Sequence, residues 1–258
     1  MISAYLRYLL RARDEHSLHS PFLFELYTRT IRNQPDTTSF GDVRALRNRL
    51  IRSRQTISIT DFGAGSRINA SRQRALGDIV RNSEKPARFG RLLYRLIRRF
   101  NARTVLDLGT SLGLTTVYLS RAAAETGGNV LTFEGCPETA AVAQQHFDEL
   151  ACPNVRIVVG NIDETLAPAV ARLDQIDLAF FDANHRYEPT VRYFETCLPK
   201  VHNDTVFIFD DIHWSGEMEQ AWAQIQQHPA VTASIDLFYV GLVFFRKEQP
   251  QQAFTLRF

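Results

Sequence analysis

A stretch of ten residues, 104–113, constrains the fold of this chain more than any other part of the sequence. Its first half, 104–108, is a short apolar run that includes β-branched residues, as is typical of a strand buried on both faces. The chain then turns through Gly109 and Gly113 and continues as a helical pattern over 114–124. A strand, a glycine turn and a helix in this order bring backbone N–H groups up to a ligand. The stretch therefore predicts a ligand-binding joint in an α/β fold.

Two acids accompany this joint. Asp107 lies inside the apolar run, where a carboxylate is costly to bury without a partner, and a cationic group of a ligand would be one such partner. A second predicted strand, 129–133, ends in Glu134 about 20 residues after the turn, which is the spacing of an acid that accepts hydrogen bonds from both hydroxyls of a ribose.

Strand and helix patterns alternate from residue 104 onward, and the chain closes with a β-hairpin. This alternation predicts an α/β fold with a doubly wound, mostly parallel sheet of seven strands, of which the hairpin makes one antiparallel. The further strands are expected at 154–159, 176–181, 205–209, 231–238 and 242–246.

The first part of the chain differs from the rest in charge. Residues 1–100 hold 20 Lys or Arg and 8 Asp or Glu, whereas the remainder is acidic. We therefore expect a basic, mainly helical N-terminal lobe over 1–82 and a catalytic domain over 83–258. The excess charge fits an anionic acceptor, attraction between the two parts, or a solvated helical surface, and the sequence leaves these open.

Two loops of the N-terminal lobe have more than one interpretation. The segment 61–66, Asp-Phe-Gly-Ala-Gly-Ser, is a second candidate glycine turn, but no strand with a terminal acid follows it. We therefore expect either a loop that approaches the site or a plain turn that makes no contact with it. The segment with His16 and His19 either contacts substrate or caps the helix that Pro21 opens.

Cysteine usage and hydropathy bear on the compartment. The three cysteines are odd in number and lack metal-ligand spacing, which indicates free thiols and a cytoplasmic protein. No apolar stretch approaches the length of a membrane span.

The basic run 44–54 contains no aromatic residue, which disfavours a nucleic-acid partner. A homo-oligomer is compatible with the sequence.

Polar residues or glycines follow every predicted parallel strand. Ligands of an open parallel sheet bind beyond the carboxyl ends of its strands, so these residues are expected to share one edge. They are Asp107 with the 109–113 turn, Glu134, Gly160 with Asn161, Asp182, and Asp210 with Asp211.

The order of these motifs over residues 85–246 resembles the class I S-adenosylmethionine-dependent methyltransferases, whose sheet is Rossmann-like. The matching features are Leu-Asp-Leu-Gly-Thr-Ser-Leu-Gly-Leu-Thr at 106–115, the Glu134 strand tip, and Gly160-Asn161. Phe-Asp-Ala-Asn-His-Arg-Tyr at 181–187 and Phe-Asp-Asp at 209–211 are similar to the small-molecule O-methyltransferases related to the catechol enzymes.

The resemblance implies S-adenosyl-L-methionine as the cofactor, Mg²⁺ as a second one, and a small-molecule acceptor. The turn would hold the methionine part with Thr115 near its carboxylate, Glu134 would bind the ribose, and Asn161 would lie near the adenine. The residues implied in cofactor binding are Asp107, Gly109, Thr110, Ser111, Gly113, Thr115, Glu134, Gly135, Asn161 and Asp182. The implied metal ligands are Asp182, Asp210 and Asp211.

Two positions depart from the family pattern. His185 stands where the family usually has a lysine general base, and Asp211 stands where it usually has asparagine. An imidazole can accept a proton near neutral pH, so the predicted catalytic residues are His185, Asp182 and, as a second base, His213. For His213 a metal-ligand role and a ring stacked on Trp214 stay open.

Two other classes of function compete with methyl transfer. A nicotinamide-dependent oxidoreductase would want a third glycine after Gly113, where Thr116 stands, and it has no use for the acids after the later strands. A non-enzymatic module that binds an anionic polymer or a membrane surface would depend on the basic first 100 residues.

Overall fold

The computed structural model describes residues 2–32, 39–60, 73–248 and 250–258, and it divides into two compact units. Unit 1 comprises Met1–Gln34 and Ala167–Phe258, and unit 2 comprises Pro35–Leu166. The predicted loop 61–66 lies outside the described residues.

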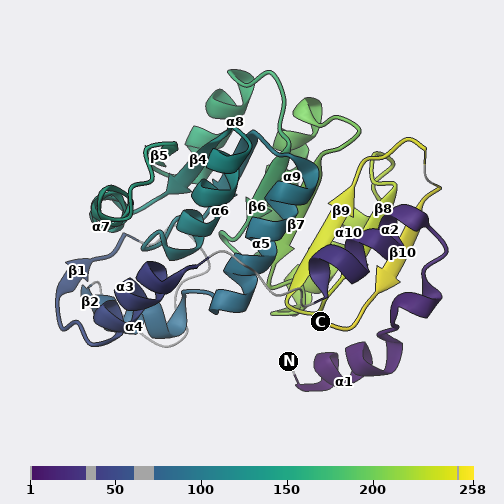
Figure 1. Cartoon of the computed structure of the whole chain (residues 1–258), viewed down its shortest axis with the longest axis horizontal. Coiled ribbons are helices and arrows are strands. Elements are labelled where there is room, and N and C mark those ends of the chain that lie inside the picture. The colour runs from purple at the N-terminus through teal and green to yellow at the C-terminus, as the bar shows by residue number, and fades with distance from the viewer. Residues whose placement is uncertain (1, 33–38, 61–72, 249) are drawn as a thin grey trace. The chain divides into compact units, whose positions relative to one another are not determined.

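Unit 2 contains three parallel strands in the order β3-β4-β5, with helices packed beside them (Figure 1). The strands are β3 (Thr104–Leu108), β4 (Asn129–Glu134) and β5 (Val155–Val159). The helices are α3 (Gly41–Ile51), α4 (Leu76–Asn82), α5 (Ala87–Phe100), α6 (Leu114–Glu125) and α7 (Pro137–Glu149), and α8 (Ile162–Ala171) begins here. A short antiparallel pair, β1 (Thr56–Ser58) and β2 (Gln73–Ala75), completes the unit.

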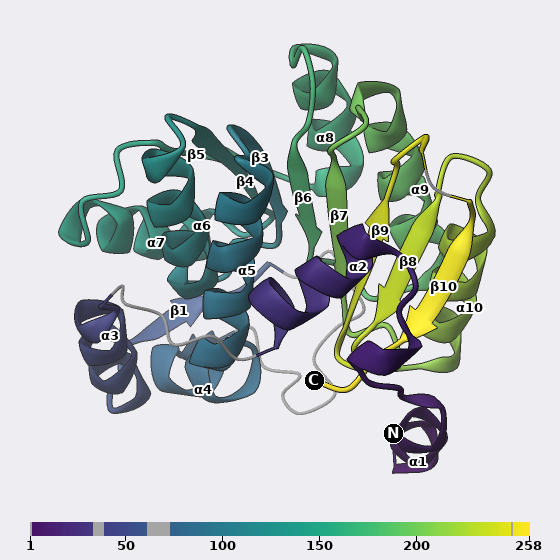
Figure 2. The ribbon, with the colours of Figure 1, turned by 45° about the vertical axis from the view of Figure 1, so that its right-hand side comes forward.

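Unit 1 contains five strands that run side by side in the order β10-β8-β9-β7-β6 (Figure 2). They are β6 (Leu178–Phe181), β7 (Val206–Asp210), β8 (Ala233–Asp236), β9 (Val240–Phe244) and β10 (Gln252–Thr255). Only β9 among these five is antiparallel to its neighbours β7 and β8, as the closing hairpin predicted. The helical segments are α1 (Ile2–Arg11), η1 (Glu15–Ser17), α2 (Pro21–Leu26), η2 (Tyr27–Ile31), α9 (Tyr187–Cys197), η3 (Leu198–Lys200) and α10 (Gly216–Gln227).

The α/β class, the mostly parallel strands and the helical N-terminal part are confirmed, but the predicted number of seven strands is wrong. In the described residues, eight strands (β3 to β10) take the place of the seven expected, because β10 adds one beside β8. The outer edge of β10 is covered by the N-terminal segment: Arg13 N donates to Thr255 O at 2.9 Å, and Arg257 N donates to Arg13 O at 3.1 Å. Covering an edge strand in this way leaves fewer unpaired backbone groups.

The division into units differs from the predicted domains. The chain divides after Gln34 and after Leu166, and the predicted boundary between residues 82 and 83 coincides with neither point. A functional lobe over residues 1–82 stays a prediction.

Helix α5 leads the chain into β3, and its apolar stripe is buried as its spacing predicts. Its partner is α6, and the two helices approach closely where Gly90 of α5 meets the ring of Tyr118. A Cβ added at Gly90 would lie 2.5 Å from that ring. This packing fixes the start of α6, which directly follows the glycine turn.

Candidate active site

The turn between β3 and α6 has a strained backbone that glycine makes possible. Gly109 and Gly113 have φ angles of 117° and 81°, and Ser111 between them has a φ of 50°. The N–H groups of Gly109 and Thr110 both donate to Phe133 O of β4, at 3.2 and 3.0 Å. The turn is therefore held against the carboxyl end of the next strand, where a ligand of such a fold binds.

Gly113 is required for both its conformation and its close packing, because an added Cβ would lie 2.6 Å from the ring of Phe147. Gly127 has a similar φ of 71°, but an added Cβ there meets nothing within 4 Å. Gly113→Ala is therefore expected to lower the free energy of unfolding by about 1 kcal/mol more than Gly127→Ala does, since only the first adds a clash to the strain. Urea denaturation of the two variants measures the difference, and equal losses would contradict this account.

Two carboxylates hold the backbone of the turn. Glu134 accepts from Ser111 N through Oε2 and from Cys136 N through Oε1, both at 2.9 Å. Glu84, which is 8% exposed, accepts from Leu112 N at 3.0 Å. The sequence predicted Glu134 and missed Glu84, because Glu84 precedes Pro86 in a segment without a motif. The one feature of the sequence that could have indicated Glu84 is its position as an acid just before the helix that leads into β3.

Asp107 has hydroxyl partners inside the fold. Its Oδ2 accepts from Thr116 Oγ1 of α6 at 2.6 Å and from Thr132 Oγ1 of β4 at 2.8 Å, and the residue is 1% exposed. Thr110 and Thr132 also share a hydrogen bond of 2.6 Å. These bonds join β3, β4 and α6 beneath the turn, so the buried acid positions the joint. Its predicted contact with the cofactor stays a prediction.

The remaining predicted cofactor residues of unit 2 lie at the ends of the same strands. Thr115 is the second residue of α6, and Gly135 follows Glu134 at the tip of β4. Asn161 follows β5 and caps α8, since its Oδ1 accepts from Asp163 N at 3.1 Å. Gly160, with a φ of 132°, donates to Glu134 O at 2.9 Å and so joins the tips of β4 and β5.

Three side chains at the carboxyl ends of β6 and β7 form a cluster in unit 1. Asp182, His185 and Asp210 each offer one ligand atom, and these atoms lie within 4.8 Å of one another. His185 Nε2 is 3.4 Å from Asp182 Oδ1, and Asp210 is 1% exposed. Two carboxylates and an imidazole are a donor set that suits a divalent cation such as Mg²⁺ or Mn²⁺.

The cluster differs in one member from the predicted metal set. His185 belongs to it, whereas Asp211 is not one of its three residues. Asp211 has a φ of 53°, and its N–H donates to Tyr239 O at 2.7 Å, so this residue makes the turn that follows β7. Asn184 and His185 also have positive φ angles, 65° and 20°. Strained backbone next to such a cluster is typical of functional sites.

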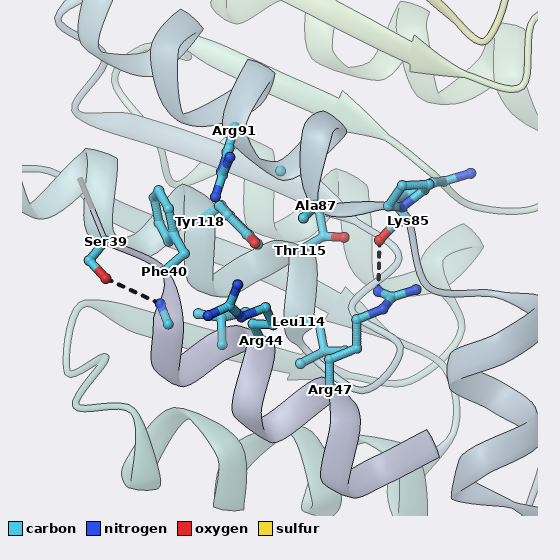
Figure 3. Close-up of a pocket in the computed structure, with 14 residues that line it drawn as sticks. Ser39, Phe40, Arg44, Arg47, Lys85, Ala87, Arg91, Leu114, Thr115 and Tyr118 are labelled. Atoms are coloured by element: carbon cyan, nitrogen blue, oxygen red, sulfur yellow. Dashed lines mark hydrogen bonds between the residues drawn. The ribbon is translucent and has the colours of Figure 1, made fainter. Parts of the chain in front are cut away.

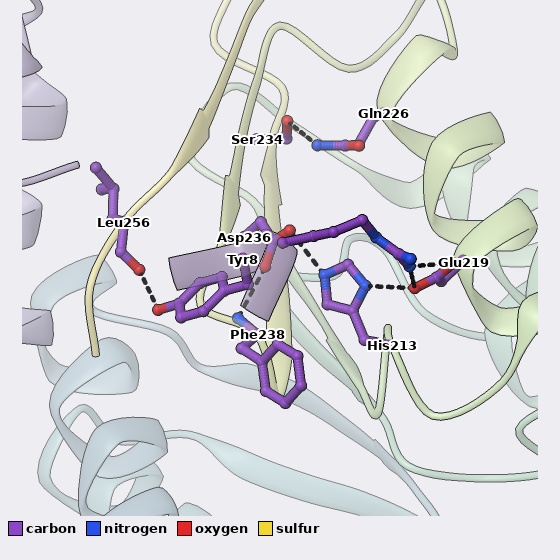
Figure 4. Close-up of polar contacts among 9 residues, drawn as sticks. Tyr8, His213, Glu219, Gln226, Ser234, Asp236, Phe238 and Leu256 are labelled. Atoms are coloured by element: carbon purple, nitrogen blue, oxygen red, sulfur yellow. Dashed lines mark hydrogen bonds and ion pairs between the residues drawn. The ribbon is translucent and has the colours of Figure 1, made fainter. Parts of the chain in front are cut away.

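His213 lies in a separate place in unit 1, between two carboxylates (Figure 4). Its Nε2 contacts Asp236 Oδ2 at 2.8 Å, and its Nδ1 contacts Glu219 Oε1 at 3.3 Å. The ring stacks on Phe238, with centroids 5.3 Å apart, and not on Trp214 as one interpretation had it. With both nitrogens engaged, His213 links α10 to β8, and its catalytic role stays a prediction.

The surroundings of His213 give the fold a pH dependence. Burial by itself lowers the pKa of His213, but Asp236 and Glu219 outweigh burial and raise the pKa above its ordinary value. A raised pKa in the folded state adds stability that is fully present below the unfolded pKa of about 6.5 and is lost as the pH rises through the folded pKa. His213→Gln is therefore expected to cost more unfolding free energy at pH 6 than at pH 9. Denaturation at both pH values tests this, and a cost independent of pH would refute it.

The segment with the first two histidines acts as a capping segment. The Asp14 side chain accepts from His16 N at 3.2 Å, and Ser20 Oγ accepts from Leu23 N at 3.4 Å at the start of α2. Pro21 is the first residue of α2, which confirms the capping interpretation. His16 and His19 are exposed.

The glycine turn, the acid at the tip of the following strand and the mostly parallel strands define an α/β domain of the methyltransferase type. Residues 106–212 match the model of a family described as a methyltransferase domain. The match begins inside β3 and ends just after β7, so it includes both the glycine turn and the acidic cluster.

Two curated relatives of this chain carry the name catechol O-methyltransferase. The chain is 29% identical over 131 residues to a catechol O-methyltransferase of Niastella koreensis and 32% identical over 127 residues to one of Mycobacterium tuberculosis. These alignments cover 50% and 49% of this chain but only 58% and 56% of those relatives.

Two solved O-methyltransferases share the fold. The enzyme TomG from Streptomyces achromogenes, in complex with SAM, has a TM-score of 0.56 at 21% identity over 64% of this chain and 82% of its own. The Bacillus cereus enzyme, in complex with SAH, has a TM-score of 0.55 at 21% identity over 63% and 83%. Among the described residues, no helix combines the length and apolar character needed to span a membrane.

Proposed function

We propose that this protein is an S-adenosylmethionine-dependent O-methyltransferase that acts on a small molecule with the help of a divalent cation. The observation that carries the proposal is the cluster of Asp182, His185 and Asp210, which follows the strands of a methyltransferase domain. A plain methyl-transfer site has no need of two carboxylates and an imidazole within 4.8 Å. A site that binds a divalent cation beside the acceptor, by contrast, needs such a set of ligand atoms.

The cofactor site is proposed at the turn after β3. Glu134 uses one lone pair on each oxygen for the N–H groups of Ser111 and Cys136, and a carboxylate has about four such acceptor sites. The remaining acceptor sites would bind the ribose hydroxyls. The two backbone bonds fix the carboxylate in place, so it would need no reorientation when the cofactor arrives.

Asp182 and Asp210 would hold the cation, and His185 would complete the set or serve as the base. Bound there, a divalent cation lowers the pKa of an acceptor hydroxyl and stabilises its oxyanion. His185 contacts Asp182, which would orient the imidazole toward the acceptor hydroxyl whose proton it takes. Asp211 would then shape the backbone after β7.

The relatives named catechol O-methyltransferase suggest an acceptor with adjacent hydroxyls. Incubation of the protein with labelled S-adenosylmethionine, Mg²⁺ and catechol is expected to give methylated catechol, and EDTA is expected to abolish the transfer. His185→Gln should lower the rate at least tenfold. If catechol and a panel of other ortho-diols all fail to accept a methyl group, the catechol-type acceptor is wrong.

The competing classes of function find less support. The family match and the acidic cluster favour methyl transfer over hydride transfer by a nicotinamide enzyme. The three cysteines are buried free thiols, which supports the cytoplasm as the proposed compartment.

A further inference from the structure

A cavity of about 220 Å³ lies within unit 2, among helices α3, α5 and α6 (Figure 3). Four of the described residues that line it carry positive charge: Arg44, Arg47, Lys85 and Arg91. None of the described lining residues is an Asp or a Glu. So strong an excess of one charge in one cavity requires an explanation, because like charges held together cost free energy unless an anion offsets them.

The charges of two of these residues are not balanced within the described chain. Arg49 and Arg121 of the same unit each pair with a carboxylate, on Glu149 and Asp42 respectively. Arg44 and Arg91, by contrast, make no ion pair with any described residue. Both side chains reach toward the same space beside Tyr118, Arg44 from α3 and Arg91 from α5 (Figure 3).

One wall of the cavity is held by hydrogen bonds of Arg47. Arg47 donates to Lys85 O at 2.8 Å and to Glu84 O at 3.2 Å, so its guanidinium joins α3 to the segment before α5. Both acceptors are neutral carbonyl groups, and Arg47 therefore keeps its full positive charge while holding the cavity in shape.

The helix ends add to the positive potential. Gly41, Ala87 and Leu114 are the first residues of α3, α5 and α6, and all three line the cavity. The N-terminus of a helix carries about half a positive charge, and these helices have 11, 14 and 12 residues. The helix ends add to the positive potential in the cavity, but most of this potential comes from the charged side chains.

Three residues with hydroxyl groups also line the cavity: Ser39, Thr115 and Tyr118. Tyr118 is wedged between Phe40, whose ring centroid is 4.3 Å away, and the backbone of Gly90. Burial raises the pKa of Tyr118, so its phenol keeps its proton and can donate a hydrogen bond.

We propose that this cavity is a binding site for the phosphate or carboxylate group of a ligand other than the methyl donor. S-adenosylmethionine has one carboxylate but also a sulfonium and an ammonium group, so its net charge is positive, and four cations without a lining carboxylate oppose its binding inside the cavity. Thr115 lies at the start of α6, where the cavity and the proposed cofactor turn meet. An anion with two or more charges suits the cavity, because guanidinium groups bind phosphate and carboxylate oxygens in pairs. This site goes beyond the proposed methyl transfer and does not depend on it.

The test compares two double variants that remove the same charge. Arg44→Gln with Arg91→Gln changes the cavity, whereas Arg52→Gln with Arg54→Gln changes two exposed arginines of the same unit outside it. Each protein is titrated by calorimetry in metal-free buffer with inorganic pyrophosphate, with citrate and with S-adenosylhomocysteine. Pyrophosphate and citrate separate the phosphate source from the carboxylate source.

We expect pyrophosphate, citrate or both to bind the unchanged protein and the control variant alike, and to bind the cavity variant at least tenfold more weakly. S-adenosylhomocysteine should bind all three proteins equally. Anion binding that survives in the cavity variant, or that is missing from the unchanged protein, overturns the proposal. The proposal is also overturned if the cavity variant binds S-adenosylhomocysteine more weakly to the same degree, since the arginines would then bind the cofactor. If S-adenosylhomocysteine binds none of the proteins, the proposed function fails, and the anion titrations still decide this site.

Discussion

Asp210→Asn is expected to weaken Mg²⁺ binding about 100-fold, because it removes one of the two carboxylates of the cluster. The substitution keeps the size of the side chain at a position that is 1% exposed, so the effect reports on charge more than on packing. Calorimetric titration with Mg²⁺, repeated with Mn²⁺ by electron paramagnetic resonance, measures it without any need for an acceptor.

Asp211→Asn is the matched control for this experiment. Asp211 is adjacent in sequence but outside the cluster, and asparagine tolerates its φ of 53° well. We expect its Mg²⁺ affinity to change less than fivefold. If the two variants weaken binding equally, the metal set deduced from the geometry is wrong, and the one implied by the family resemblance is correct.

Glu134→Ala is expected to weaken S-adenosylhomocysteine binding at least tenfold, or about 1.4 kcal/mol. Two effects add: the ribose loses its proposed acceptor, and the N–H groups of Ser111 and Cys136 lose theirs, which loosens the turn. Glu134→Gln separates the effects, since an amide oxygen can still accept one of these bonds while the charge is gone. Unchanged affinity in Glu134→Ala would show that the ribose binds elsewhere.

The parts of the fold that the sequence predicted best are those whose residues are buried in a regular pattern. Strand β3 has the predicted bounds, 104–108, because a fully buried apolar run that ends at a glycine turn allows one solution. Strand β10 was missed because only Ala253 and Phe254 of its four residues are apolar, and none of the four is buried. Its stability comes from pairing with β8, which no local pattern encodes.

In the candidate site, too, the contacts set by spacing along the chain could be predicted, and those set by packing between distant segments could not. Glu134 and the glycine turn follow from spacing along the chain, and the structure joins them by a direct hydrogen bond. Glu84 and the cavity arginines could not be predicted, because their meeting depends on how α3, α5 and α6 pack. The exchange of Asp211 for His185 in the cluster depends on backbone φ angles after β6 and β7, which the sequence does not reveal.

Calorimetric titration of the unchanged protein with S-adenosylhomocysteine, with and without Mg²⁺, tests the central claim most directly. The account predicts saturable binding of one molecule per chain in both conditions, since the cofactor turn and the acidic cluster are built from different strands. Absence of binding at millimolar S-adenosylhomocysteine in both conditions would contradict it.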